Sequence, residues 1–476
     1  MQRNLFFLLG VIVVVLAGCS LAPKYTQPEA PVPAGWPTGA AYKDTGDTSG
    51  AAIAAELGWQ EFFTDERLKK IIAAALQNNR DLRLAALNVQ KARALYGIQR
   101  AELLPAVDAT AGYSKQLVPT STYGSLASGL SSKSITMTQY DINLGISSWE
   151  IDFFGLIRSL KDEALEEYLA TDQARISAQI SLVSSLAEAY LTLAADRESL
   201  KIAQSTLKSQ QATYDLIKKR NQVGIANELD LSRAQTQVDT AIGDVARFTQ
   251  LAAQDENALN LLAGSTLPDE LLPSDLSSLK TPQEISAGIS SEVLLRRPDV
   301  LQAEHMLKAA YADIGAARAA FFPRISLTAA AGIASGDLSG LFKYGSDAWS
   351  YAPQIVMPIF DARIWPALRA SNVERESALA QYEKAIQTAF REVADALAVQ
   401  GTVGRRLSAQ ESLLNASAET YRLSDVRYSR GIDNYLGVLD AQRSLYAARQ
   451  GLIAVRLDKL TNQVRLYNVL GGGAKE

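Results

Sequence analysis

Very few side chains in this sequence could carry out covalent chemistry. Its 476 residues include one cysteine, Cys19, and one histidine, His305. A single thiol cannot form a disulfide within its own chain, and the sequence has neither a P-loop nor clustered metal-ligand spacing. We expect His305 to be an ordinary helix-packing or surface residue. The sequence therefore predicts a protein that is not an enzyme and that has no metal or dissociable cofactor.

The cysteine follows a segment that is typical of a secretory signal. Residues 1–18 contain a short positive region and an apolar core of about a dozen residues, too short to span a bilayer comfortably. Their end, LAGC at residues 16–19, resembles the bacterial lipobox, in which the peptide is cut before the cysteine. That resemblance implies diacylglyceryl and N-acyl lipid on Cys19, and Ser20 fits sorting to the outer membrane. The alternative is an ordinary signal peptide with an incidental cysteine.

The composition beyond the signal narrows the class of protein. Residues 19–60 are predicted to form a lipid-anchored arm, because Pro, Gly, Thr and Ala are frequent there. The chain has 47 Lys and Arg against 51 Asp and Glu, a net charge of -4, without a basic block. This balance argues against nucleic acid as a partner. No apolar run beyond residue 20 approaches the length of a membrane helix, so we expect any membrane crossing to use strands.

The chain contains a large internal duplication. NQVGIANELDLSRAQ, Asn221–Gln235, aligns without a gap with YSRGIDNYLGVLDAQ, Tyr428–Gln442. The shift of about 207 positions is nearly half the chain, which indicates a duplicated half-protein rather than a solenoid of short repeats. We predict a first structural repeat at residues 61–265, a linker at 266–282 and a second repeat at 283–476.

Each repeat is predicted to contain one very long helix and one shorter partner. Leu156–Val223 has no proline and little glycine, and its apolar residues recur with heptad spacing. Pro366–Arg430 has the same pattern in the second half. A helix of roughly 65 residues is on the order of 100 Å long, far longer than a usual globular helix. The shorter partners are Asn227–Leu262 and Asn434–Leu470.

A glycine and an asparagine stand between the two helices of each pair. Gly224 and Asn227 occupy this position in the first half, and Gly431 and Asn434 in the second. Glycine commonly ends a helix and asparagine commonly caps the next one. The duplicated segment therefore predicts the tip of a helix hairpin, present twice.

Near Pro105 and Pro323 the apolar period changes from seven residues to two. Four segments alternate in this way, two in each half, within 107–114, 141–146, 325–332 and 351–360. The alternation is typical of outer-membrane barrel strands, although a half-buried soluble sheet gives the same pattern. Because spanning barrels have about eight strands or more, four strands cannot enclose a pore. A barrel therefore requires several copies of the chain, and such an assembly with long helices would form a conduit.

Three further motifs complete the pattern: LRRPDV at Leu295–Val300, ARAAFFPRISLTA at Ala317–Ala329, and GIDNYLGVLDAQR at Gly431–Arg443. With the lipobox and the duplicated halves, they resemble the TolC-like outer-membrane efflux protein family, and its OprM-like branch in particular. The resemblance implies a fold that is mainly α with a membrane β-barrel, in a homotrimer with about twelve barrel strands and a periplasmic α-barrel. It also implies a periplasmic adaptor and an inner-membrane pump as partners, and passage of drugs or other small solutes out across the outer membrane.

The same resemblance implies a gate at the hairpin tips. Asp230 matches an acidic position of the first hairpin, Tyr428 a tyrosine that tethers the hairpins, and Asp440 a carboxylate at the aperture. Three copies of Asp440 around a narrow axis would concentrate cations. For Asp230 the alternative is a first-turn carboxylate favoured by the helix dipole.

The second tip departs from the family pattern at Asp433, where some members have an arginine that contributes to the tether. This departure leaves Arg430 and Arg427 as the candidate basic residues of the gate.

Two other interpretations remain open at the level of sequence. A duct for metal ions or for secreted polypeptide would have the same fold. A non-conducting, lipid-anchored coiled-coil scaffold would share the anchor and the long helices, but it would need neither alternating strands nor acidic hairpin tips.

Overall fold

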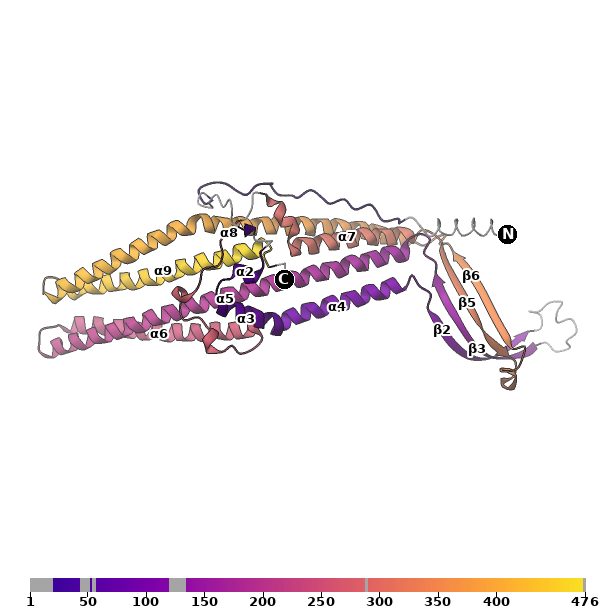
Figure 1. Ribbon diagram of the computed structural model, residues 1–476, viewed down its shortest axis with the longest axis horizontal. Coiled ribbons are helices and arrows are strands. Elements are labelled where there is room, and N and C mark those ends of the chain that lie inside the picture. The colour runs from indigo at the N-terminus through magenta and orange to yellow at the C-terminus, as the bar shows by residue number, and fades with distance from the viewer. Residues whose placement is uncertain (1–19, 43–51, 54–56, 120–133, 287–289, 474–476) are drawn as a thin grey trace. The chain divides into compact units, whose positions relative to one another are not determined.

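The computed structural model describes residues 20–42, 52–53, 57–119, 134–286 and 290–473. The chain divides into two compact units, each assembled from separate stretches of sequence (Figure 1). Unit 1 comprises residues 1–27, 90–169 and 305–380, and unit 2 comprises residues 28–89, 170–304 and 381–476. The predicted signal segment and Cys19 lie outside the described residues.

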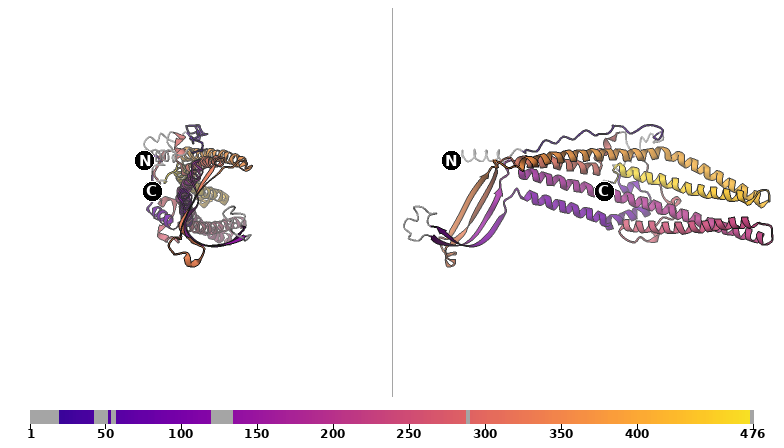
Figure 2. Two further views of the ribbon diagram at one scale, coloured as in Figure 1. Left: turned by 90° about the vertical axis from the view of Figure 1, so that its right-hand side faces the viewer. Right: turned by 180° about the vertical axis from the view of Figure 1, so that it is seen from behind.

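Unit 1 contains an antiparallel sheet of four strands (Figure 2). In sheet order these are β2 (Val107–Pro119), β3 (Ser134–Glu150), β5 (Arg324–Ser335) and β6 (Asp347–Val356). Each half of the chain contributes one antiparallel pair, and β3 joins β5 with Leu144 opposite Ala331. Among the described residues, β2 and β6 each have a neighbour on one side only. The predicted division into four strands, two from each half, is confirmed.

Prolines lie just outside β5 and β6. β5 starts at Arg324, directly after Pro323. The prediction that the fourth strand continues to Phe360 was wrong, because β6 ends at Val356. Pro358 follows two residues later, and it has no N–H with which to continue the ladder.

The long helices are present close to their predicted bounds. They are α5 (Leu156–Gln222), with 67 residues, and α8 (Ile364–Ser429), with 66. Their shorter partners are α6 (Glu228–Ala263) and α9 (Tyr435–Val469). By length and composition α5 could cross a membrane, which contradicts the expectation that no such apolar run exists. Half of the most apolar part of α5 is buried within the protein, however, and a packed helix of a soluble protein can have the same length and composition.

Two medium helices precede the strand pairs, and several short elements complete the fold. The medium helices are α4 (Arg80–Ala101) and α7 (Pro298–Ala319). The short elements are α2 (Trp59–Phe62), α3 (Glu66–Asn78), η3 (Asp269–Leu271), η4 (Leu276–Ser278), η5 (Ser291–Arg296), η6 (Leu338–Gly340), and the parallel strands β1 (Ala52–Ile53) and β4 (Ile285–Ser286). In unit 2, Tyr467 of α9 stacks on Phe62 with ring centroids 4.0 Å apart, and its hydroxyl donates to the carbonyl of Leu57 at 2.8 Å.

The LRRPDV motif places a buried arginine in unit 2. The Arg297 side chain donates to Asp299 at 2.7 Å and to Glu392 of α8 at 2.9 Å. It also donates to the carbonyl oxygen of Val469, at the end of α9, at 2.6 Å. Arg297 is 8% exposed, so these contacts are shielded from water. The motif therefore fastens the start of α7 to α8 and α9.

We expect Arg297→Met to lower the free energy of unfolding by about 3 kcal/mol, because it leaves two carboxylates and a carbonyl without their shared partner. The midpoint of denaturant unfolding, followed by circular dichroism in detergent, measures the loss. Arg296→Met is the matched control, since the neighbouring Arg296 is exposed. Equal midpoints for the two variants would contradict this role.

Candidate functional site: the helix hairpin tips

Unit 2 contains two helix hairpins whose tips are built alike. The first hairpin, α5 and α6, turns at residues 223–227, and the second hairpin, α8 and α9, turns at residues 430–434 (Figure 1). Gly224 and Gly431 have φ of 76° and 73°, a conformation that glycine adopts without steric cost. The amide of each glycine donates to the carbonyl three residues earlier at 2.9 Å. Each glycine thus ends its helix in a left-handed turn.

The helices that leave the two tips are capped differently. The side chain of Asn227 accepts a hydrogen bond from the Asp230 amide at 2.8 Å, so it caps α6. Asn434 has the extended backbone of a capping residue, but its side chain makes no capping hydrogen bond to α9. The prediction that Asn434 caps its helix through its side chain was therefore wrong.

An ion pair closes the second tip instead. Arg427 donates to Asp433, with Nη2 and Oδ1 3.1 Å apart. The Arg427 guanidinium holds the pKa of Asp433 below its usual range. Within the described residues Arg430 makes no ion pair, although the sequence offered it as a gate residue. Arg427, the other basic candidate from the sequence, makes that contact.

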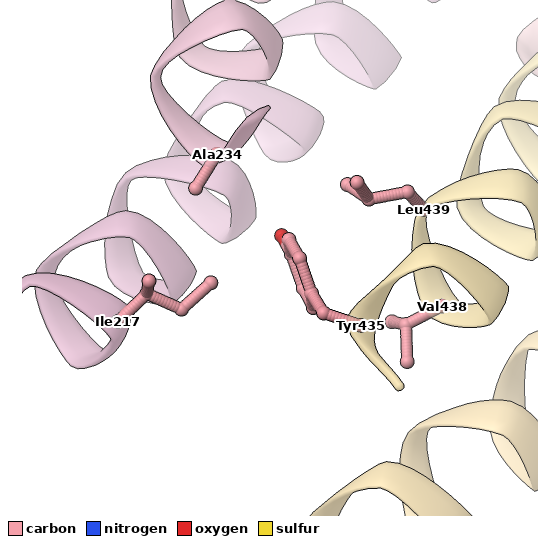
Figure 3. Close-up of a cluster of buried hydrophobic side chains, with 5 residues drawn as sticks. All are labelled: Ile217, Ala234, Tyr435, Val438 and Leu439. Atoms are coloured by element: carbon pink, nitrogen blue, oxygen red, sulfur yellow. The ribbon is translucent and has the colours of Figure 1, made fainter. Parts of the chain in front are cut away.

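A cluster of buried side chains packs the two hairpins against each other (Figure 3). Ile217 of α5 and Ala234 of α6 come from the first hairpin, and Tyr435, Val438 and Leu439 of α9 come from the second. Tyr435 is 2% exposed and points from the start of α9 toward the first hairpin (Figure 3). Burial, with smaller contributions from nearby tyrosines and Asp230, raises the pKa of its phenol. We call this set the Tyr435 cluster.

Tyr428 connects the Tyr435 cluster to an arginine of the first hairpin. Its ring centroid lies 5.4 Å from that of Tyr435. The Arg220 guanidinium, at the end of α5, donates to the Tyr428 hydroxyl at 3.4 Å and lies 5.7 Å from the ring centroid. Arg220 was not identified from the sequence. The signal that could have found it is the repeat, because Arg220 aligns with Arg427, the arginine that holds the other tip.

The two predicted gate carboxylates, Asp230 and Asp440, have different surroundings. Asp230 lies in the first turn of α6, where Asn227 binds its amide, and its carboxylate is 3.9 Å from Arg233. This geometry favours the first-turn interpretation of Asp230. Asp440 is exposed on α9, and within the described residues its carboxylate has no ion-pair partner. The Asp440 carboxylate is therefore free to meet solutes or another chain.

The single histidine belongs to unit 1, whereas the hairpin tips belong to unit 2. His305 of α7 lies 2.6 Å from a carboxylate oxygen of Glu166 of α5, so it takes part in helix packing.

Burial, together with Asp313 and Glu167, raises the pKa of the nearby Glu163 to about 7. Among the described residues no three His, Cys, Asp or Glu side chains are grouped so that they could hold a metal ion.

The sequence model of one family matches both halves of the chain. It describes outer membrane efflux proteins and matches residues 71–265 and 289–472. The chain belongs to the outer membrane efflux protein family. Proteins of this family are the outer-membrane exit ducts of tripartite efflux systems, in which they work together with adaptor and inner-membrane pump components. The predicted function as an exit duct in the outer membrane is thus confirmed.

Individual relatives agree over nearly the whole length. The toluene efflux pump outer membrane protein TtgC and the antibiotic efflux pump outer membrane protein ArpC, both from Pseudomonas putida, are each 48% identical over 467 residues. Each alignment covers 98% of this chain and 95% of the relative. The open state of the Neisseria gonorrhoeae MtrE outer membrane channel is 36% identical, with a TM-score of 0.84 over 96% of this chain and 99% of that one. The fold of this efflux protein is therefore that of a channel.

We expect Tyr435→Ala to loosen the second tip of this efflux protein. Removing the ring leaves a cavity between the hairpins, and such a truncation costs roughly 3 kcal/mol. Hydrogen exchange of the second-turn amides of α9, residues 439–442, should accelerate on the order of 100-fold, since these amides donate within the helix and local opening becomes that much easier. Leu436→Ala is the control, because the neighbouring Leu436 is 41% exposed. Equal exchange rates in both variants would show that the Tyr435 cluster does not hold the tip.

Proposed function

We propose that the two hairpin tips form the closed gate of a trimeric exit duct and that the duct conducts small organic solutes. The observation that carries this proposal is the Tyr435 cluster, which holds the two hairpins together while Asp440 stays exposed on α9. A duct closed by packing between hairpins opens when the hairpins separate, and no catalytic group is required for that movement.

The trimer is supported by the edges of the sheet. Each of the outer strands, β2 and β6, has one free edge among the described residues. In lipid every strand needs a partner on both sides, because no water is present to satisfy its backbone groups. Pairing β6 of one copy with β2 of the next satisfies both edges. Three copies then give about twelve strands, within the range of known outer-membrane barrels.

The cargo and the partners follow from the relatives. TtgC is named for efflux of toluene and ArpC for efflux of antibiotics. We infer that this efflux protein carries solutes of the same kind, small and largely apolar, received from a periplasmic adaptor and an inner-membrane pump.

In the proposed gate, Asp440 sets the charge of the aperture. Three exposed carboxylates around one axis attract cations and repel anions. The first hairpin has Arg233 at the repeat-related position. At this repeat-related position, therefore, the second hairpin has a negative charge and the first a positive one.

We expect Asp440→Asn to lower the cation-to-anion permeability ratio severalfold, because the substitution removes the charge and retains the side-chain shape. The reversal potential of the purified protein in a planar bilayer, under a salt gradient, measures this ratio. Asp239→Asn is the matched control, since Asp239 is an exposed carboxylate of α6. A ratio that is unchanged by Asp440→Asn, or changed equally by both substitutions, would contradict the role of Asp440.

We further propose that Cys19 carries lipid. The described arm begins one residue later, and the carbonyl of Leu21 accepts a hydrogen bond from Arg318 of α7 at 3.0 Å. Residues 21 and 318 both belong to unit 1, which also contains the strands. An acyl chain contributes about 0.8 kcal/mol per buried methylene, so two or more chains supply a stable anchor.

We expect the intact mass of purified protein to include diacylglyceryl and N-acyl groups, and Cys19→Ala to abolish both, because the thioether and the new amino terminus depend on the cysteine. Intact-protein mass spectrometry provides the measurement. Ser20→Ala is the control, and it should retain the lipid mass. Lipid on the Cys19→Ala protein, or none on the unmodified sequence, would refute lipidation at Cys19.

A further inference from the structure

A cavity of about 340 Å³ lies between the two hairpins of unit 2. Its walls come from α5, α6 and α9, so both hairpins contribute. Side-chain amides and hydroxyls predominate among its lining residues, together with Ala203 of α5, Ala241 of α6 and the ring of Tyr446. Sites for small molecules are usually of about this size or larger, with apolar walls and a few placed polar groups.

Gln210, which lines this cavity, has a buried acceptor without a partner. Gln210 of α5 is 4% exposed, and its carbonyl oxygen Oε1 has no hydrogen-bond partner within the part of the chain that the structure describes. A buried acceptor without a donor costs about 1–3 kcal/mol. A ligand that supplies an N–H or O–H to Gln210 would recover this energy.

The opposite wall offers groups of the complementary kind. Arg443 of α9 crosses to the first hairpin, where its Nε donates to Gln237 at 3.3 Å. Burial, together with Asp244, raises the pKa of Tyr446 to about 12, so this phenol is neutral at physiological pH. The charges of Arg443 and Asp244 offset each other, which favours a neutral ligand over an ion.

The duplicated half shows why this cavity is present. Gln410 of α8 aligns with Ala203, and its side-chain amide donates to the carbonyl of Ala448 in α9 at 3.0 Å. A methyl group added at Gly451 would lie 2.5 Å from the same amide. Gln410 therefore fills the space between α8 and α9. In the first half the shorter Ala203 stands at the position of Gln410 and lines the cavity, and Asp244 stands at the position of Gly451.

We propose that this cavity is a binding site for a small neutral aromatic amide that bridges the two hairpins. The ligand donates its amide N–H to Gln210, accepts from Arg443 with its carbonyl, and packs its ring against Ala203 and Ala241. Because the walls come from both hairpins, the ligand binds the packed arrangement better than a separated one, and it shifts the population toward that arrangement. This step rests on the proposed gate: if the packed hairpins close the duct, a ligand that favours the packed arrangement inhibits conduction.

Benzamide is the probe for the binding test. Equilibrium dialysis of radiolabelled benzamide against the full-length protein in detergent should show saturable binding. Ala203→Gln gives the first half the side chain that fills the second, and it should weaken binding at least tenfold. Gln210→Leu removes the acceptor with little change in volume, and it should also weaken binding about tenfold.

Ser417→Ala is the matched control, since Ser417 is the buried repeat counterpart of Gln210 outside the cavity. It should leave benzamide binding unchanged. Absence of saturable binding by the unmodified protein would overturn the proposal. Equal binding by the unmodified protein, Ala203→Gln and Gln210→Leu would also overturn it, because benzamide would then bind elsewhere.

The inhibitory role needs a separate measurement. Benzamide should lower the conductance of the unmodified protein in a planar bilayer and leave the Ala203→Gln protein unaffected. Binding without any change in conductance would overturn the inhibitory role. A protein that does not conduct at all would contradict the proposed function, whereas the dialysis result does not depend on conduction.

Discussion

The free edges of the four-stranded sheet are the constraint on which the rest of this efflux protein depends. Within the described residues β2 and β6 are paired on one side only, and hydrocarbon offers their backbone groups no alternative partner. The only way to satisfy them is another strand, and the only strands available to a homomeric assembly are those of further copies. Duplication reduces the number of copies that a closed barrel needs, because one chain then supplies two strand pairs, two long helices and two hairpin tips.

In the duplicated halves, the residues that both copies share build the same turn, and the residues that differ give each turn different contacts. Gly224 and Gly431 both take positive φ and end their helices in the same way. The contacts around them differ, since Arg220 reaches Tyr428 in the other hairpin whereas Arg427 pairs with Asp433 in its own tip. The repeat supplied the same basic residue twice, and divergence of its neighbours gave it two roles.

Local pattern was enough to predict most of the fold, but not the contacts of the candidate site. The proline-free heptad segments located α5 and α8 to within two residues, because helix length and apolar period are both properties of nearby sequence. The contact between Arg220 and Tyr428 joins residues 208 positions apart, and no local pattern encodes it. Asn434 has the residue type and the extended backbone of a cap, yet its side chain does not bond to α9, because residue type sets a preference for capping and not the contact itself.

In the proposed gate, packing between the hairpins contributes more than charge to the closed arrangement. Arg427 and Asp433 are 54% and 44% exposed at their side chains, and exposed pairs of this kind contribute little and weaken further with salt. Arg427 and Asp433 also belong to the same hairpin, so their pair shapes the tip without holding it to the first hairpin. The Tyr435 cluster does cross between the hairpins, and burial of a large aromatic ring contributes about 2–3 kcal/mol that salt does not screen. The proposed gate, held in this way, would resist changes in ionic strength, and competition for the apolar surface around Tyr435 would be the most direct way to open it.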